Sequence, residues 1–129
     1  MATILIIDDD VQILWVMRKM LEQAGHTVMS ASDGEKGFKL YHDSPTDLVI
    51  TDMIMPGKSG MNIVADLLHD QPDAKIIAIS GGGAIEAERY LNLARTLGAQ
   101  ATLSKPFSMQ ALLDTVQNVL ARPARTVDL

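Results

Sequence analysis

Short apolar runs alternate along this chain with longer segments whose apolar residues recur every three or four positions. The runs are rich in Ile, Val and Leu, which is typical of buried strands, and the longer spacing predicts amphipathic helices. We expect five strands, at Thr3–Ile7, His26–Ala31, Asp47–Thr51, Lys75–Ile79 and Ala101–Leu103. We expect helices at Val11–Ala24, Met61–His69, Ala84–Leu97 and Ser108–Ala121. A short helix of about two to three turns is expected after Asp33-Gly34, which breaks the second strand, and runs to roughly His42. Gly25, Gly98 and Pro123 are helix stop signals.

This alternation predicts an α/β domain. Apolar strands connected by helical crossovers form a parallel sheet that is covered on both faces, a doubly wound fold with right-handed crossovers. The chain has 129 residues, contains no internal repeat and has no linker longer than a turn. We therefore expect a single domain over residues 1–122 and a short C-terminal tail over residues 123–129. Met53–Gly60 and Gly81–Gly83 are expected to be loops.

Polar residues gather where the predicted strands end. Asp8, Asp9 and Asp10 follow the first strand, Asp52 follows the third and Ser80 follows the fourth. Ligands of open α/β sheets bind outside the carboxyl ends of the strands, and a strand order of 2-1-3-4-5 makes the first and third strands neighbours. Clustered carboxylates either raise a pKa or hold a cation. Oxygen ligands without nearby His or Cys suit Mg²⁺.

An acidic run at a strand end also has a purely structural interpretation. Asp10 directly precedes a predicted helix and is expected to be its N-cap. The other polar residues favour a chemical site, because each supplies a different part of a phosphoryl transfer. A carboxylate such as Asp52 is a nucleophile, the Ser80 hydroxyl is a hydrogen-bond donor, and Lys105 neutralises phosphoryl charge. Lys105 precedes Pro106, and a cis peptide bond there would aim its side chain into the site.

Composition and charge exclude several classes of protein. The chain lacks cysteine, so it has neither disulfides nor thiolate metal sites, and its net charge of −5 argues against a nucleic-acid-binding face. No apolar run approaches the ~18 residues of a membrane span. The N-terminus is not a signal peptide, and a cytoplasmic location is expected by elimination. The glycines at 81–83 match neither common nucleotide-binding pattern.

Several of these segments together resemble the receiver domain of two-component response regulators, including the chemotaxis regulators. The resemblance covers about Thr3 to Leu120. Its motifs are I-L-I-I-D-D-D at Ile4–Asp10, D-G-E-K-G-F at Asp33–Phe38, D-L-V-I-T-D-M-I-M-P-G at Asp47–Gly57, Ser80, L-G-A at Leu97–Ala99 and S-K-P-F at Ser104–Phe107. The resemblance implies a flavodoxin-like (βα)₅ fold with strand order 2-1-3-4-5.

The resemblance also implies roles for individual residues. Asp52 would be the phosphoacceptor. Asp9 would bind Mg²⁺ directly and Asp8 through water, and Asp52 and the Ile54 backbone carbonyl would complete the protein ligands. Ser80 would be the switch hydroxyl and Lys105 the salt-bridge partner of the phosphoryl group.

The resemblance implies partners as well. The phosphoryl donor would be a sensor histidine kinase or a histidine phosphotransfer protein, and a downstream protein target would read the phosphorylated state. The domain would catalyse its own phosphorylation and dephosphorylation, with no separate substrate turnover.

The chain departs from the family pattern at several positions. Thr102 stands where the family usually has Tyr or Phe, so the aromatic output arm is missing. Ile54 and Gly82, two residues after Asp52 and Ser80, offer no polar side chain to position water. The last predicted helix lacks the basic residues that many DNA-binding members use to dimerise.

Two further questions stay open at this point. Trp15 either covers the seam between the first and last helices or contacts a partner, and it shares a helix flank with Lys19 and Glu22. The alternative function is a Mg²⁺-dependent phosphatase resembling the haloacid dehalogenase superfamily, whose D-x-D motif Asp8–Asp10 matches only loosely. A flavodoxin-like cofactor binder is a third alternative, and the carboxylates count against it.

Overall fold

The computed structural model describes residues 1–55, 60–81 and 84–123, in which five strands alternate with five helices. The strands are β1 (Thr3–Ile7), β2 (Thr27–Ala31), β3 (Leu48–Asp52), β4 (Ile76–Ser80) and β5 (Ala101–Ser104). The helices are α1 (Val11–Gln23), α2 (Gly34–Asp43), α3 (Gly60–Asp70), α4 (Ala84–Leu97) and α5 (Met109–Ala121). Every predicted element is confirmed, with shifts of one or two residues at several ends.

The strands form one parallel sheet in the order β2-β1-β3-β4-β5. This is the predicted order, and it places β1 and β3 side by side with Ile7 opposite Thr51. The residues that follow these two strands therefore emerge at one edge of the sheet, which we call the carboxyl edge. The edge at which the strands begin is the amino edge.

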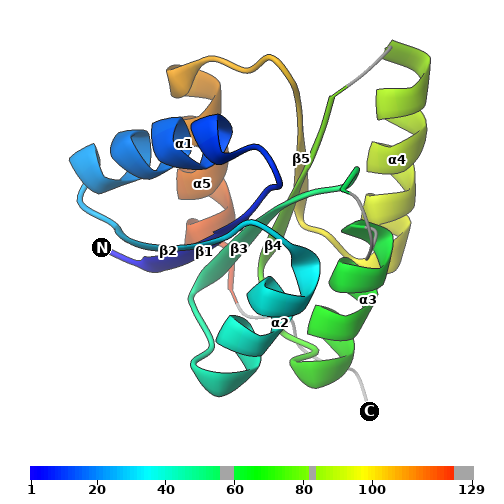
Figure 1. Cartoon of the computed structure of the whole chain (residues 1–129), viewed down its shortest axis with the longest axis horizontal. Helices are drawn as coiled ribbons and strands as arrows, with labels where there is room; N and C mark the ends of the chain where they lie inside the picture. The colour runs from blue at the N-terminus through cyan, green and yellow to red at the C-terminus, as the bar shows by residue number, and fades with distance from the viewer. Residues whose placement is uncertain (56–59, 82–83, 124–129) are drawn as a thin grey trace.

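Two apolar layers cover the two faces of the sheet (Figure 1). On one face, the predicted stripe of α1 (Leu14, Met17 and Leu21) packs with Leu112 and Val116 of α5. On the other face, residues of α2, α3 and α4 pack against alternate strand residues. Both faces of the central strands are buried, which explains why these strands appear in the sequence as continuous apolar runs.

The predicted helix signals act as expected. Asp10 is the N-cap of α1, and its carboxylate accepts hydrogen bonds from the backbone N–H groups of Gln12 and Ile13. Gly25 and Gly98 follow α1 and α4 with φ values of +97° and +122°, a backbone region that glycine adopts without steric cost.

Gly37, inside α2, lets that helix approach β1 closely. A β-carbon at this position would lie 2.5 Å from the Ile7 Cδ1 atom and 2.7 Å from its Cγ1 atom. The second glycine of the D-G-E-K-G-F motif is therefore needed for packing directly beneath the carboxyl edge.

Parts of three predictions lie outside the described residues: 56–59 of the first expected loop, 82 and 83 of the second, and 124–129 of the expected tail. None of the helices within the described ranges is long and apolar enough to cross a membrane.

Candidate functional site

Three carboxylates from two neighbouring strands meet at the carboxyl edge. Asp8 and Asp9 follow β1, and Asp52 is the last residue of β3. One carboxylate oxygen from each lies within 4.8 Å of the others. Asp8 and Asp52 are buried, with only 2% and 4% of their surface exposed, whereas Asp9 is exposed. The sequence prediction that these residues lie together is confirmed.

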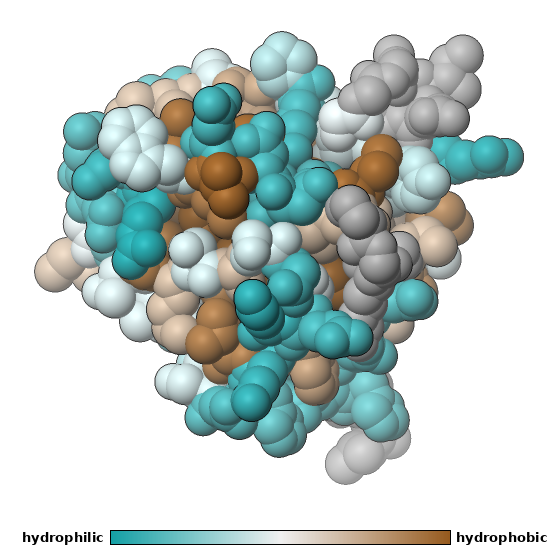
Figure 2. All heavy atoms as spheres, viewed as in Figure 1, coloured by the Kyte–Doolittle hydropathy of each residue, from teal (hydrophilic) through white to brown (hydrophobic). Residues whose placement is uncertain are grey.

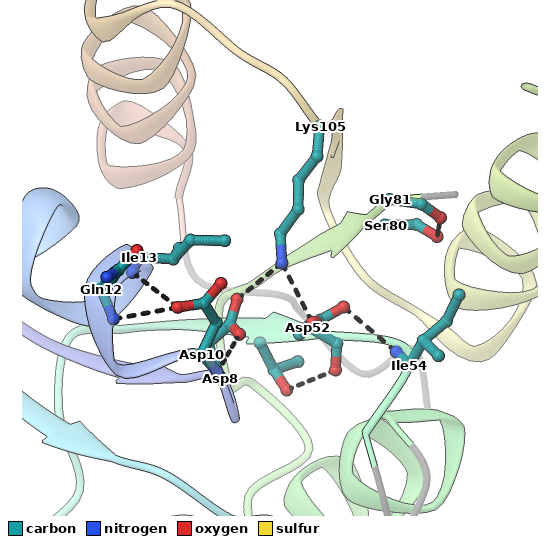
Figure 3. A network of polar contacts seen from close by, with 10 residues as sticks. Asp8, Asp10, Gln12, Ile13, Asp52, Ile54, Ser80, Gly81 and Lys105 are labelled. Carbon is teal, nitrogen blue, oxygen red and sulfur yellow. Dashed lines mark hydrogen bonds and ion pairs between the residues drawn. The ribbon is translucent and has the colours of Figure 1, made fainter. Parts of the chain in front are cut away.

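Lys105 joins the two buried acids. Its Nζ donates to Asp8 Oδ2 at 2.9 Å and to Asp52 Oδ2 at 3.1 Å (Figure 3). The Lys105–Pro106 peptide bond is cis. The cluster thus has one cation for two buried carboxylates, and Asp9 adds a third negative charge at the surface.

Backbone N–H groups orient both buried carboxylates. The Asp10 N–H donates to Asp8 Oδ1 at 2.9 Å, and the Ile54 N–H donates to Asp52 Oδ1 at 3.1 Å. Asp10 therefore has two functions, because its side chain caps α1 while its backbone holds Asp8. Each carboxylate is held at both oxygens, which fixes its direction.

Burial and charge shift two pKa values in the cluster. Burial raises the pKa of the Asp8 carboxyl above its ordinary value, more than the hydrogen bonds from Asp10 and Lys105 lower it, and the Asp52 charge raises it further. Burial alone would lower the pKa of the Lys105 ammonium, but its hydrogen bonds to Asp8 and Asp52 outweigh this and raise it. Lys105 is therefore a permanent cation at neutral pH.

Ser80 ends β4 beside β3 and is buried, and its hydroxyl donates to the Gly81 carbonyl at 3.3 Å. In Figure 3 this hydroxyl is turned toward Gly81 and away from Asp52. The Ser80 hydroxyl thus lies at the carboxyl edge, as Asp8 and Asp52 do. Its hydrogen bond to the Gly81 carbonyl is long, so a stronger acceptor can compete with that carbonyl for the hydroxyl.

Gly81, which the sequence predicts only to belong to a loop, contributes directly to the site. A β-carbon on Gly81 would lie 3.2 Å from Lys105 Cδ and 3.5 Å from its Cβ. The absence of a side chain lets the Lys105 stem pass over β4 toward the acids. The signal in the sequence was the glycine directly after the strand-end serine.

Thr102, in place of the usual aromatic residue, has a polar partner on α4. Arg95 Nη2 donates to Thr102 Oγ1 at 2.6 Å, and Arg95 Nη1 donates to Asn92 Oδ1 at 3.0 Å. Hydrogen bonding, rather than aromatic packing, therefore connects α4 to β5 at this position.

An apolar groove runs beside the acids. A cavity of about 670 Å³ lies between α1 and the segment Lys105–Phe107, and Ile13 and Val16 line its α1 wall. Trp15 is 62% exposed and is not part of the α1–α5 cluster; Lys19 Nζ lies 5.7 Å from its ring centroid. This favours the partner-contact interpretation of Trp15. Figure 2 shows hydrophobic side chains exposed over the α1 region of a mainly hydrophilic face.

The donor atoms suit a hard divalent cation. The three acids offer only carboxylate oxygens, and no His or Cys belongs to the group. With one lysine against three acids, the cluster keeps an excess of negative charge that a cation would neutralise. The residues present therefore fit Mg²⁺.

Comparisons with known proteins agree with this geometry. A family model for the response regulator receiver domain matches residues 4–117. Protein PilH of Pseudomonas aeruginosa is 33% identical over 122 residues, which are 94% of this chain and 99% of PilH. The transcriptional regulatory protein CpxR of Escherichia coli is 35% identical over 124 residues, 95% of this chain and 50% of CpxR. The chain thus spans about half the length of some curated relatives, such as CpxR, and nearly all of others.

Solved structures support the same assignment. The crystal structure of a response regulator receiver domain protein from Clostridium thermocellum superposes with a TM-score of 0.85 at 34% identity, over 93% of this chain and 94% of that one. Nothing in these matches supports the alternative of a haloacid-dehalogenase-like phosphatase.

Proposed function

The chain belongs to the response regulator receiver family of two-component signalling, and on that basis we propose that Asp52 accepts a phosphoryl group from a phosphohistidine. The observation that carries the proposal is the position of Asp52. It is a buried carboxylate at the end of a central strand, with a lysine ammonium bound to one oxygen and a second acid beside it.

The reaction is a direct transfer between two side chains. A carboxylate oxygen of Asp52 attacks the phosphorus of the phosphohistidine, and the P–N bond breaks. The leaving imidazole takes a proton from solvent, so that a neutral histidine and an aspartyl phosphate are formed. Lys105, already in contact with Asp52, offsets the charge of the phosphoryl oxygens. Hydrolysis by water later releases phosphate and restores Asp52.

Mg²⁺ would be held by Asp9 and Asp52, by Asp8 through water and by the Ile54 carbonyl. When bound, it neutralises charge on the transferring group. The contribution of this chain is a set of carboxylates that is held in place before the ion arrives, because Asp10 and Ile54 already fix the directions of Asp8 and Asp52. The assignment of the Ile54 carbonyl stays a prediction.

The structural change that follows phosphorylation is expected to be transmitted to the surface through Ser80. An aspartyl phosphate adds acceptor oxygens that compete with the Gly81 carbonyl for the Ser80 hydroxyl, whose present hydrogen bond is long. Rotation of the Ser80 side chain toward the phosphoryl group would move the chain after β4. This movement would change the surface of α4 and β5, to which a downstream protein binds. Here that surface includes the Arg95–Thr102 contact instead of an aromatic side chain.

The phosphodonor partner is a sensor histidine kinase or a histidine phosphotransfer protein, and we assign it to the α1 side of the site. The exposed Trp15 and the apolar groove beside Lys105 both lie there. Trp15→Ala is expected to slow transfer from a phosphorylated histidine protein more than transfer from acetyl phosphate. Equal loss with both donors would assign Trp15 a structural role.

Intact mass spectrometry after incubation with Mg²⁺ and acetyl phosphate tests the central proposal. We expect one phosphoryl adduct that requires Mg²⁺ and is absent in Asp52→Asn. Asp47→Asn is the matched control, because Asp47 precedes the same strand but lies at its other end. An adduct that persists in Asp52→Asn, or turnover of phosphomonoesters without any adduct, would contradict the proposal.

A further inference from the structure

Thr51, the residue before Asp52 in β3, is a polar residue inside an apolar layer. None of its surface is exposed, and its neighbours across the sheet are Ile7 of β1 and Ala78 of β4. Both neighbours belong to the apolar core on the face that α2, α3 and α4 cover. A buried hydroxyl is costly unless it is hydrogen-bonded, and valine would fill a similar volume without that cost. Packing alone therefore does not explain a threonine at this position.

The Thr51 hydroxyl binds the backbone of Asp52. Thr51 Oγ1 donates to the Asp52 carbonyl oxygen at 3.1 Å. The same peptide unit is held on its other side, because the Met53 N–H donates to the Ile79 carbonyl of β4 at 2.8 Å. Two hydrogen bonds thus fix the plane of the Asp52–Met53 peptide at the point where β3 ends.

The plane of this peptide determines where the Ile54 N–H points. That N–H donates to Asp52 Oδ1 at 3.1 Å (Figure 3), and only Met53 separates it from the fixed peptide. Met53 is itself in the core, with 1% of its surface exposed. Rotation of the Asp52–Met53 peptide would therefore move the Ile54 N–H away from the Asp52 carboxylate.

We propose that Thr51 is a positioning residue for the phosphorylation of Asp52, an inference that rests on the function proposed above. Its hydroxyl fixes the Asp52–Met53 peptide, so that the Ile54 N–H holds the Asp52 carboxylate in the direction of attack. Because Thr51 is completely buried, it cannot contact a phosphodonor and acts only through the Asp52 backbone.

Thr46, which precedes the same strand at its other end, offers a matched control. Its hydroxyl donates to the Leu48 carbonyl at 2.9 Å, which is the same kind of hydrogen bond to the same strand. Thr46→Val and Thr51→Val therefore remove the same chemical group from the two ends of β3, and only one of these ends carries Asp52.

The first measurement is hydrogen exchange of the backbone amides in the Mg²⁺-free protein, followed in ¹H–¹⁵N spectra. Relative to the amides of β1, the Ile54 amide should exchange about fivefold faster in Thr51→Val than in the wild type, the effect of one neutral hydrogen bond. In Thr46→Val it should exchange at the wild-type rate. This measurement does not require phosphorylation.

The second measurement is the rate of adduct formation with Mg²⁺ and acetyl phosphate. Thr51→Val keeps the volume but loses the hydroxyl, and it should slow the reaction about fivefold. Thr51→Ser keeps the hydroxyl and loses only a methyl group from the core. It should lower the midpoint of urea denaturation but keep the wild-type rate. A purely structural role would reverse this order, because the variant with the poorer core packing would then be the slower one.

Three results would overturn the proposal: wild-type exchange of the Ile54 amide in Thr51→Val, a wild-type phosphorylation rate in that variant, or an equally low rate in Thr51→Ser. If Thr51→Val does not fold, Thr51→Ala replaces it, because alanine and serine at this position differ only by the hydroxyl. Absence of any adduct in the wild type would contradict the phosphorylation of Asp52 itself. The exchange of the Ile54 amide would still decide whether Thr51 holds this segment.

Discussion

Two lysines at opposite edges of the sheet bind oxygen atoms for different purposes. At the carboxyl edge, Lys105 donates to the side chains of Asp8 and Asp52. At the amino edge, Lys75 donates to the backbone carbonyls of Leu120 and Arg122, which α5 leaves without helical partners. Lys105 thus binds carboxylates that a ligand can also bind, whereas Lys75 provides hydrogen-bond partners for the backbone carbonyls at the end of α5.

The acids differ between the edges in the same way. Asp47 joins the start of β3 to Thr3 and is a structural residue. Asp8 and Asp52 are held by backbone N–H groups and by Lys105, but they also repel each other. The difference indicates that the carboxyl edge contains charges that lower stability but serve the reaction, whereas the amino edge contains contacts that raise stability. Substitutions at the two edges should therefore affect the phosphorylation rate and the free energy of unfolding separately.

The largest expected effect is the loss of phosphorylation in Lys105→Met. Removal of the cation that touches Asp52 should slow adduct formation from acetyl phosphate by about 100-fold or more, the usual cost of losing one preorganised charge contact. Lys75→Met should leave this rate unchanged and lower the free energy of unfolding by about 1–2 kcal/mol. Time-resolved intact mass and urea denaturation measure the two quantities. Equal rates in the two variants would remove the distinction between the edges.

Two glycine substitutions at the carboxyl edge should separate an effect on the free energy of unfolding from an effect on the phosphorylation rate. Gly37→Ala forces a methyl group into Ile7 and should cost about 1–2 kcal/mol of unfolding free energy, after the gain in helix propensity is counted. Gly81→Ala meets only the flexible Lys105 stem, so it should barely change stability but slow phosphorylation. Urea denaturation and adduct formation check both, and a larger stability loss in Gly81→Ala would refute this reasoning.

Asp8→Asn should stabilise the metal-free protein at neutral pH, because it removes a buried charge that the Asp52 charge repels. The native state of the wild type keeps its Asp8 proton to a higher pH than the unfolded chain does. Its stability is therefore lost as pH rises from the ordinary value of 3.8 through the raised native pKa. Asparagine does not titrate, so the gain should appear across that range and vanish at lower pH.

Urea denaturation between about pH 3 and pH 7, without Mg²⁺, measures the Asp8 effect. Asp10→Asn is the control, because Asn also caps helices and Asp10 lies outside the buried pair. A gain in Asp8→Asn that does not depend on pH would rule out the electrostatic cause.

The smallest expected effect is at the α4–β5 contact. Thr102→Val removes the acceptor of Arg95 on an exposed surface and should cost only a few tenths of a kcal/mol. Thr102→Ser keeps the hydroxyl and should match the wild type in urea denaturation. A loss of several kcal/mol in Thr102→Val would mean that this contact is structural, as those at the amino edge are.

Local patterns in the sequence were enough to predict the secondary structure and the edge that carries the site. The apolar runs predicted all five strands, and glycine and cap residues predicted where helices begin and end, because these signals act within a few residues. The residues of the acidic cluster were predicted because each follows a strand, and parallel strands end at the same edge. Asp52 was expected after β3 and is its last residue, a shift of one position.

Distances between side chains far apart in the chain were decided only by the tertiary structure. Lys105 lies 97 residues from Asp8 and 53 from Asp52, yet its Nζ touches both. The register of β1, β3 and β4 and the bare backbone at Gly81 make this possible. In the sequence, Tyr41 was one aromatic residue at the end of a helix. Its burial exists only after α2 and α3 have packed on the sheet, because burial is a property of the assembled layers and not of any local segment.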